Sequence, residues 1–133
     1  MIKKDILIAV VDGQGGGIGR QYIESLTKQL PKDLPVIIRA LGTNSAATSN
    51  MMRAGATDGA TGENAIVKNA GRADIIVGVV AIVVPDSILG ELSPKMSGRA
   101  MPCVSSFHLT AAIPGLPCFL PDLCSNSLTR LSK

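Results

Sequence analysis

The sequence has few aromatic residues: one tyrosine, two phenylalanines and no tryptophan. Because 46% of its 133 residues are nevertheless hydrophobic, any core must be built mainly from Val, Ile, Leu and Ala. Such aliphatic cores are typical of α/β folds, whose parallel strands are buried on both faces. The length corresponds to one small domain.

The chain also lacks strong charge, long apolar runs and paired cysteines. Its formal net charge is +3 and its basic residues are scattered, so we expect no nucleic-acid partner. The longest apolar run, residues 75–84, is about half of what a membrane span needs, and the N-terminus lacks the apolar region of a signal peptide. Three cysteines without CxxC spacing favour neither disulfides nor a metal site. We therefore predict a cytoplasmic protein without a membrane partner.

Strand and helix patterns alternate through residues 1–98. Residues 5–11 and 35–42 predict buried strands bounded by glycine, and "ADIIVG" (residues 73–78) predicts a third. A helical pattern follows the first strand and stops at Pro31, and shorter helical patterns lie later in the chain, at 43–55 and 61–71 among others. This order predicts one α/β domain with a doubly wound parallel sheet.

Several predicted helices have residues that suit their ends. Residues 43–45 are polar N-cap candidates, and Gly55 stands where a C′ glycine belongs. Asp86 is a further N-cap candidate, and Ser93 is another, followed by Pro94 at the first helical position.

A glycine-rich turn, in the segment "VVDGQGGGIGRQ" (residues 10–21), joins the first strand to the first helix. A turn at this place brings backbone N–H groups together at a helix N-terminus, where an anion is stabilised. We expect it to bind the phosphate of a nucleotide or dinucleotide, and the alternative is a tight turn that binds nothing. The expected contacts are Gly13, Gln14, Gly15, Gly16, Gly17, Ile18 and Gly19.

Polar residues follow the other predicted strands. Thr43 and Asn44 come after the second strand, and Thr61, Glu63 and Asn64 open a helix after "DGATG". All would face the carboxyl edge of the sheet, where ligands of open α/β sheets bind. The alternative is that Thr43 and Thr61 cap helices and that Glu63 serves a capping arrangement.

Two charged residues flank the glycine-rich turn. Asp12 would repel a phosphate, so we expect its side chain to form an Asx turn that shapes the loop. Arg20 lies just inside the helix, where its charge suits an anion.

The order G-x-x-x-G-x-G, formed by Gly13, Gly17 and Gly19, resembles the glycine motif of short-chain dehydrogenases, and so does the ending "GIGR". The "NAG" segment at residues 69–71 is also similar to a segment of that family. This resemblance implies NAD or NADP as the cofactor.

The catalytic part of that family's pattern is absent. The only tyrosine, Tyr22, is followed four residues later by Leu26, whereas the family carries Tyr-x-x-x-Lys. No ribose-binding acid stands near the end of the second strand, where residues 42–44 are Gly, Thr and Asn. We therefore do not expect a catalytically competent short-chain dehydrogenase.

A broader resemblance covers most of residues 5–98. The segments that carry it, in chain order, are "VVDGQGGGIG", "ALGTNSAATSNMMRAGA", "GATGENAIV", "ADIIVG" and "GELSPKM". In kind, order and spacing they resemble a family of small bacterial proteins, the domain of unknown function 3842. The resemblance implies a Rossmann-like fold and leaves the function open.

Residues 99–133 differ from the domain predicted at 1–98. They hold all three cysteines, the single histidine and four of the eight prolines, and Pro102 would interrupt the helix after "SPKM". No final strand is legible there, so we expect the family resemblance to stop at about Gly98. The segment is either a divergent tail or the product of a frame shift, and we expect it to be irregular and to add no site residue.

Three classes of function are compatible with these features. Residues 1–98 contain no legible acid–base pair or nucleophile, which favours a nucleotide- or dinucleotide-binding module with a regulatory or sensing role over an enzyme. The alternatives are a small NAD(P)-dependent oxidoreductase or transferase and a structural α/β subunit without a ligand. Because three legible strands leave exposed sheet edges, we also expect a homodimer.

Overall fold

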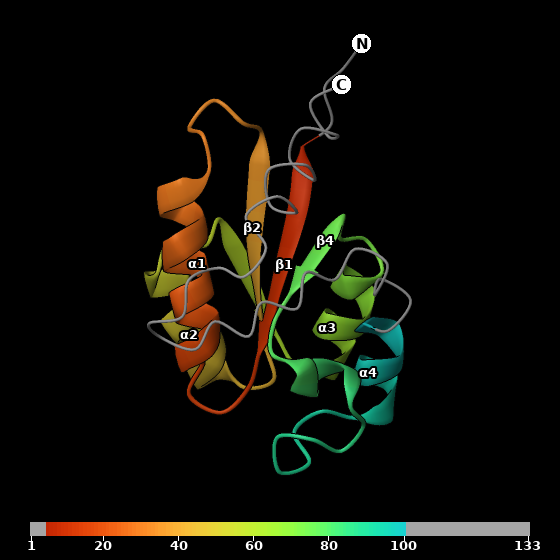
Figure 1. Ribbon diagram of the computed structural model, residues 1–133. Coiled ribbons are helices and arrows are strands. Elements are labelled where there is room, and N and C mark those ends of the chain that lie inside the picture. Colours follow the sequence, from red (N-terminus) through yellow and green to blue (C-terminus); the bar gives the residue numbers. More distant parts are fainter. Residues whose placement is uncertain (1–4, 101–133) are drawn as a thin grey trace.

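The computed structural model describes residues 5–100, without the side chain of Val80, and its strands alternate with helices (Figure 1). The strands are β1 (Ile6–Asp12), β2 (Val36–Gly42), β3 (Asp58–Thr61) and β4 (Ile75–Val77). The helices are α1 (Gly17–Gln29), α2 (Ser45–Arg53), α3 (Glu63–Ala70) and α4 (Pro94–Ala100), with a 3₁₀ turn, η1 (Val80–Val83), after β4.

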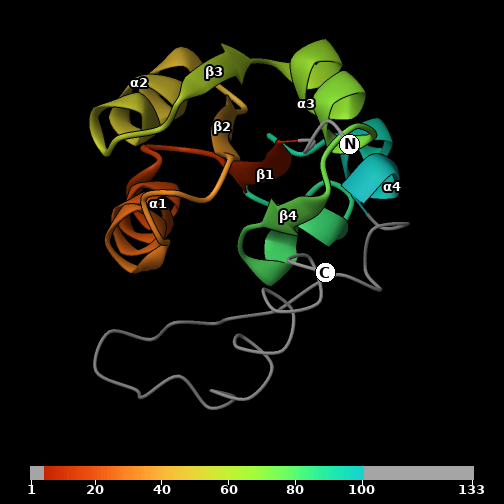
Figure 2. The same ribbon diagram turned by 90° about the horizontal axis from the view of Figure 1, so that it is seen from above.

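The four strands form one parallel sheet in the order β3-β2-β1-β4. The chain therefore builds outward from β1 to β3 and then returns to the other side of β1, so the strand order reverses between β1 and β4. Helices α1 and α2 cover one face of the sheet, and α3 and α4 cover the other (Figure 2). This is the doubly wound α/β fold that the sequence predicts, and it is Rossmann-like.

The core lies on both faces of the sheet because successive residues of β1 point in opposite directions. Ile8 and Val10 belong to the cluster under α1 and α2, whereas Ala9 and Val11 belong to the cluster under α3 and α4. The first cluster also contains Ile23, Ile38, Ala40 and Met51. The second also contains Leu41, Ile66, Ala70, Ile76, Ile82, Leu92 and Met96. A strand buried on both faces explains the uninterrupted apolar run in β1.

Strand β3 was not predicted from the sequence. Its four residues, "DGAT", contain no apolar alternation and no aliphatic β-branched pair. The strand forms because it pairs with β2, with Arg39 opposite Asp58 and Gly42 opposite Thr61. Tertiary pairing therefore outweighs a weak local preference for strand.

The helix ends mostly follow the predicted capping residues. Asn44 is the N-cap of α2 and accepts a hydrogen bond from the N–H of Ala47 at 2.9 Å. Gly55 follows α2 with a φ of 109°, as the C′ position requires. The hydroxyl of Ser93 accepts from the N–H of Met96 at 3.3 Å in the first turn of α4.

The predicted N-cap at Asp86 is wrong. Asp86 has a left-handed φ of 59°, and it opens a series of turns between η1 and α4 instead of a helix. Ile88 and Leu89 are also left-handed, with φ of 53° and 55°. The N–H of Asp86 donates to the carbonyl of Leu92 at 2.8 Å, which closes residues 86–92 into a loop.

The predicted irregular segment, residues 99–133, lies almost wholly outside the described residues. Its first two residues, Arg99 and Ala100, belong to α4. Within residues 5–100, every helix is too short or too polar to cross a membrane.

Candidate functional site

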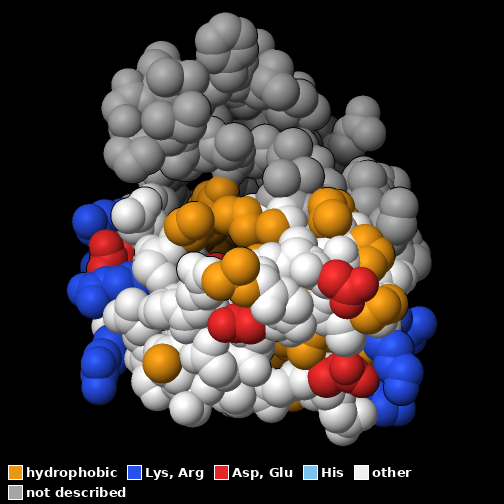
Figure 3. Space-filling view, turned by 90° about the horizontal axis from the view of Figure 1, so that it is seen from below, with side chains coloured by type: hydrophobic (Ala, Val, Ile, Leu, Met, Phe, Trp, Pro, Cys, Tyr) orange, Lys and Arg blue, Asp and Glu red, His pale blue; other side chains and the backbone are white. Residues whose placement is uncertain are grey.

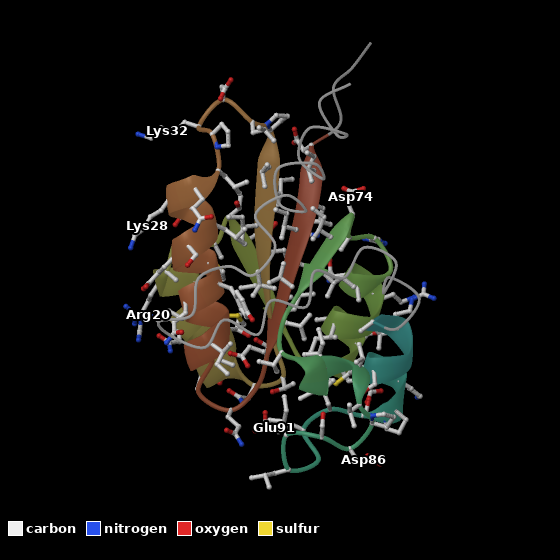
Figure 4. All side chains as sticks on the ribbon, in the orientation of Figure 1. Arg20, Lys28, Lys32, Asp74, Asp86 and Glu91 are labelled. Atoms are coloured by element: carbon white, nitrogen blue, oxygen red, sulfur yellow. The ribbon has the colours of Figure 1, made fainter. Side chains whose placement is uncertain are left out.

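The candidate site lies at the carboxyl edge of the sheet, where β1 leads through residues 13–16 into α1. This edge faces downward in Figure 1, and both Asp86 and Glu91 lie beneath it (Figure 4). Gly16 is the N-cap of α1 and has a left-handed φ of 69°, and Gln14 is also left-handed at 48°. Because the strand order reverses beside β1, this is the region where open α/β sheets bind their ligands.

Three of the five glycines in this turn leave no room for a side chain unless a neighbouring group shifts. A Cβ on Gly16 would lie 2.6 Å from the carbonyl oxygen of Ala47 in α2, and the backbone there is left-handed as well. A Cβ on Gly13 would lie 2.7 Å from Oε2 of Glu91. A Cβ on Gly19 would collide with a methionine side chain of α2. The glycines at these positions let the loop and α1 approach their neighbours.

The other two glycines are not required by the fold. Gly15 and Gly17 are exposed, neither has a positive φ, and a Cβ on either would meet no other described part of the chain within 4 Å. The cap residue of α1 offers no side-chain hydrogen bond. Within residues 5–100, the N–H groups of Gly15, Gly17 and Ile18 donate no hydrogen bond, so they are available to a ligand.

Two asparagines of the α2 region fix the orientation of the loop. The carbonyl oxygen of Gln14 accepts from Nδ2 of Asn44 at 2.9 Å, and that of Gly15 accepts from Nδ2 of Asn50 at 3.0 Å. Because a trans peptide holds its C=O and N–H in opposite directions, the N–H of Gly15 points away from Asn44. Asn50 was not predictable as a site residue, since a polar residue within a helix carries no local signal of this contact.

Asp12 shapes the loop, but not through the predicted Asx turn. That turn would place its carboxylate on the N–H of Gln14. Instead Oδ1 accepts from the N–H of Gly13 at 2.8 Å, and Oδ2 accepts from the N–H of Gly19 at 2.7 Å. Asp12 is buried, with 6% of its surface exposed. The carboxylate therefore accepts from one N–H in the first turn of α1 and connects the two ends of the glycine-rich loop.

A second carboxylate, that of Glu91, reaches the loop from the segment after β4. Its Oε2 atom accepts from the N–H of Gln14 at 2.8 Å, from the hydroxyl of Thr43 at 2.5 Å and from Nδ2 of Asn44 at 3.3 Å. The hydroxyl of Thr43 and the N–H of Gln14 hold the pKa of Glu91 below its ordinary value. Glu91 was not predicted as a site residue because the resemblance of its segment, "GELSPKM", assigns no role to it.

The predicted site residues after β3 are not joined to the loop. The hydroxyls of Thr61 and Thr48 lie 2.7 Å apart, so Thr61 contacts α2. Glu63 forms an ion pair with Lys95 at 3.9 Å, and Asn64 is exposed. The structure thus brings together residues 13–19, Thr43 and Asn44, and it leaves these three residues at the edge strand of the sheet.

Positive side chains do not line the loop. Nε of Arg20 pairs with Glu24 at 2.8 Å, and its Nη1 donates to Asn50 at 3.2 Å, so this guanidinium is held along α1 and α2 (Figure 4). Where the carboxyl edge is seen face-on, Lys and Arg side chains lie at its two flanks, and acidic and hydrophobic side chains lie between them (Figure 3). Any anion bound at the loop would therefore rest on backbone N–H groups.

The described residues contain no group of three His, Cys, Asp or Glu that would hold a metal ion.

The family profile described as "Domain of unknown function (DUF3842)" matches residues 7–107, which is most of the chain. The chain belongs to the DUF3842 family. Neither the curated proteins nor the solved structures contain a match to it.

The match confirms the predicted resemblance and reaches past Gly98, where we expected it to end. The DUF3842 domain includes the loop, Thr43, Asn44 and Glu91, so the candidate site lies wholly within the matched range.

Proposed function

We propose that this DUF3842 domain binds a nucleotide or dinucleotide, whose phosphate accepts hydrogen bonds from the N–H groups of Gly15, Gly17 and Ile18. The observation that carries this proposal is the presence of glycine at two exposed positions where the fold does not need it. A side chain at Gly15 or Gly17 would stand beside these N–H groups and obstruct a phosphate. Glycine leaves the backbone accessible, as in other anion sites at helix N-termini.

The charges around the loop favour a ligand with few phosphates. Helix α1 places roughly half a positive charge at its N-terminus. The carboxylates of Asp12 and Glu91 offset part of this charge, because both bind within the same turn. A triphosphate would meet more repulsion here than the diphosphate bridge of a dinucleotide, so NAD or NADP fits better than ATP or GTP.

The role that fits best is regulatory or sensing. Each of the two carboxylates accepts hydrogen bonds from the loop, so both are engaged in holding the structure together. Neither carboxylate is wholly free to act as a general base, since both oxygens of Asp12 and Oε2 of Glu91 accept hydrogen bonds from the loop. A module that binds an intracellular nucleotide would act in the cytoplasm.

A thermal-shift screen of the full chain tests this proposal. The compounds are NAD, NADP, FAD, ATP, GTP and S-adenosylmethionine. A ligand present at 100 times its Kd should stabilise the folded state by about 2.7 kcal/mol. Because S-adenosylmethionine carries no phosphate, an unchanged melting temperature with the other five compounds would contradict the proposal.

A further inference from the structure

Glu91 brings a carboxylate to the end of β2, where the chain itself has none. Residues 42–44 at this point are Gly, Thr and Asn. Glu91 follows β4 in the chain, yet its Oε2 atom accepts from the hydroxyl of Thr43 at 2.5 Å and from the amide of Asn44 at 3.3 Å. The structure therefore places an acid beside the second strand, although the sequence order separates the two.

The other oxygen of this carboxylate has room for a ligand. All three hydrogen bonds of the side chain fall on Oε2, and within residues 5–100 Oε1 accepts none. The three bonds fix the position of the carboxylate, so Oε1 is held in place without being satisfied. A fixed acceptor of this kind matches the hydroxyl groups of a sugar.

Position and chemistry together suggest which part of the ligand meets Glu91. In dinucleotide-binding α/β sheets, an acid after the second strand accepts hydrogen bonds from the ribose hydroxyls, while the phosphates lie at the first turn. Here the same Glu91 oxygen that meets Thr43 also meets the N–H of Gln14 in that turn. Glu91 therefore contacts both the turn that would hold the phosphate and the end of β2, where the ribose would lie.

On the basis of the proposed function, we infer that Glu91 is a specificity-determining residue that accepts hydrogen bonds from an unmodified ribose and so selects NAD over NADP. A 2′-phosphate would bring negative charge against this carboxylate. Among the described residues, no Lys or Arg bonds to Thr43, Asn44 or Glu91, so no cation is fixed there to offset the repulsion. The flanking positions of the basic side chains in Figure 3 agree with this.

Calorimetric titration of the full chain with NAD and with NADP tests the inference. The parent should bind NAD at least about tenfold more tightly, as expected for one hydrogen bond to a charged group. Glu91→Gln should weaken NAD binding by a similar factor and bring the two affinities together. The matched control is Asp86→Asn, on the same segment, where Asn tolerates the left-handed backbone and both affinities should stay unchanged.

A charge-reversal variant distinguishes a specific effect on binding from a loss of binding through misfolding. Glu91→Lys should bind NADP more tightly than the parent does, a gain that an unfolded variant cannot produce. Equal affinity of the parent for NAD and NADP would overturn the inference, and so would tighter binding of both by Glu91→Gln, which would mark Glu91 as a competitor of the phosphate.

The inference and the proposed function fail in different ways. If FAD, ATP or GTP stabilises the chain but neither NAD nor NADP binds, the proposed function stands and the inference falls. If none of these five phosphate-bearing compounds binds, both fall.

Discussion

The Oδ2 atom of Asp12 accepts a hydrogen bond from the N–H of Gly19 at 2.7 Å, across the whole glycine-rich turn. The other oxygen of the same carboxylate accepts from Gly13 at 2.8 Å. One buried side chain thus connects the end of β1 to the first turn of α1. Because the chain itself fixes the shape of the loop through these bonds, binding has less entropy to overcome.

We predict that Asp12→Asn lowers the free energy of unfolding by roughly 1–3 kcal/mol, because an amide cannot accept both N–H bonds and leaves one buried donor unsatisfied. Urea unfolding measures this change. Asp33→Asn is the matched control, since Asp33 is exposed and should give the stability of the parent. Equal stability of both variants would contradict the role assigned to Asp12.

The two kinds of glycine should respond differently to alanine. Gly16→Ala should lower stability by roughly 1–3 kcal/mol, because it combines a left-handed backbone with a collision against Ala47. Gly15→Ala should leave stability unchanged or raise it by up to about 1 kcal/mol, because it restricts only the unfolded chain. Similar losses in both variants would show that the fold requires glycine at position 15 as well.

The main features of the fold are predictable from the sequence because the local hydrophobic patterns agree with the burial of the strands. The apolar run of β1 and the glycines that follow it predict a parallel α/β sheet, and the structure confirms one. Strand β3 was not predictable in this way. Strand β3 pairs with β2, where Arg39 lies opposite Asp58. The local pattern of "DGAT" gives no sign of this pairing.

The candidate site was predictable only where its residues directly follow a strand. The glycine loop, Thr43 and Asn44 lie next to strand ends in the sequence, and the topology brings them together. Glu91 reaches the same place through the loop of residues 86–92, whose left-handed turns no pattern announces. A carboxylate contributed by a distant turn becomes visible only in three dimensions.

Arg39 and Asp58 should stabilise the sheet by fastening β3 to β2. Nε of Arg39 lies 2.6 Å from Oδ1 of Asp58, and Nη2 lies 2.7 Å from Oδ2, while Nη1 donates to Asn69 of α3. Arg39 holds the pKa of Asp58 below its ordinary value through this hydrogen-bonded pair. A double-mutant cycle of Arg39→Met and Asp58→Asn should give a coupling energy of about 1 kcal/mol that decreases in high salt. A coupling energy of zero would contradict this.

The contact of Glu91 should make stability depend on pH. Its folded-state pKa lies below the ordinary value of 4.5, mainly through the hydroxyl of Thr43 and then the N–H of Gln14. Its stabilising contribution is therefore complete above that value and is lost as the pH falls through the folded-state pKa. Urea unfolding should show the parent more stable than Glu91→Gln at about pH 6, with a smaller difference at about pH 3. The same difference at both pH values would contradict the assignment.

We predict that the chain forms a homodimer. In the described part of the sheet, β3 and β4 are the outer strands, and outer strands present backbone groups that another chain can pair. Sedimentation equilibrium should give the mass of two chains, and a monomer at high micromolar concentration would contradict this prediction.

The most direct test of nucleotide binding at the loop is calorimetric titration of Gly17→Val with the nucleotide that stabilises the parent most. A Cβ at Gly17 meets no other described part of the chain within 4 Å, so the variant should fold and should lose binding by at least about a hundredfold. Gly98→Val is the matched control, because Gly98 is an exposed helical glycine with equally open surroundings and lies in α4. This control should bind like the parent. A folded Gly17→Val variant with the affinity of the parent would contradict nucleotide binding at the loop.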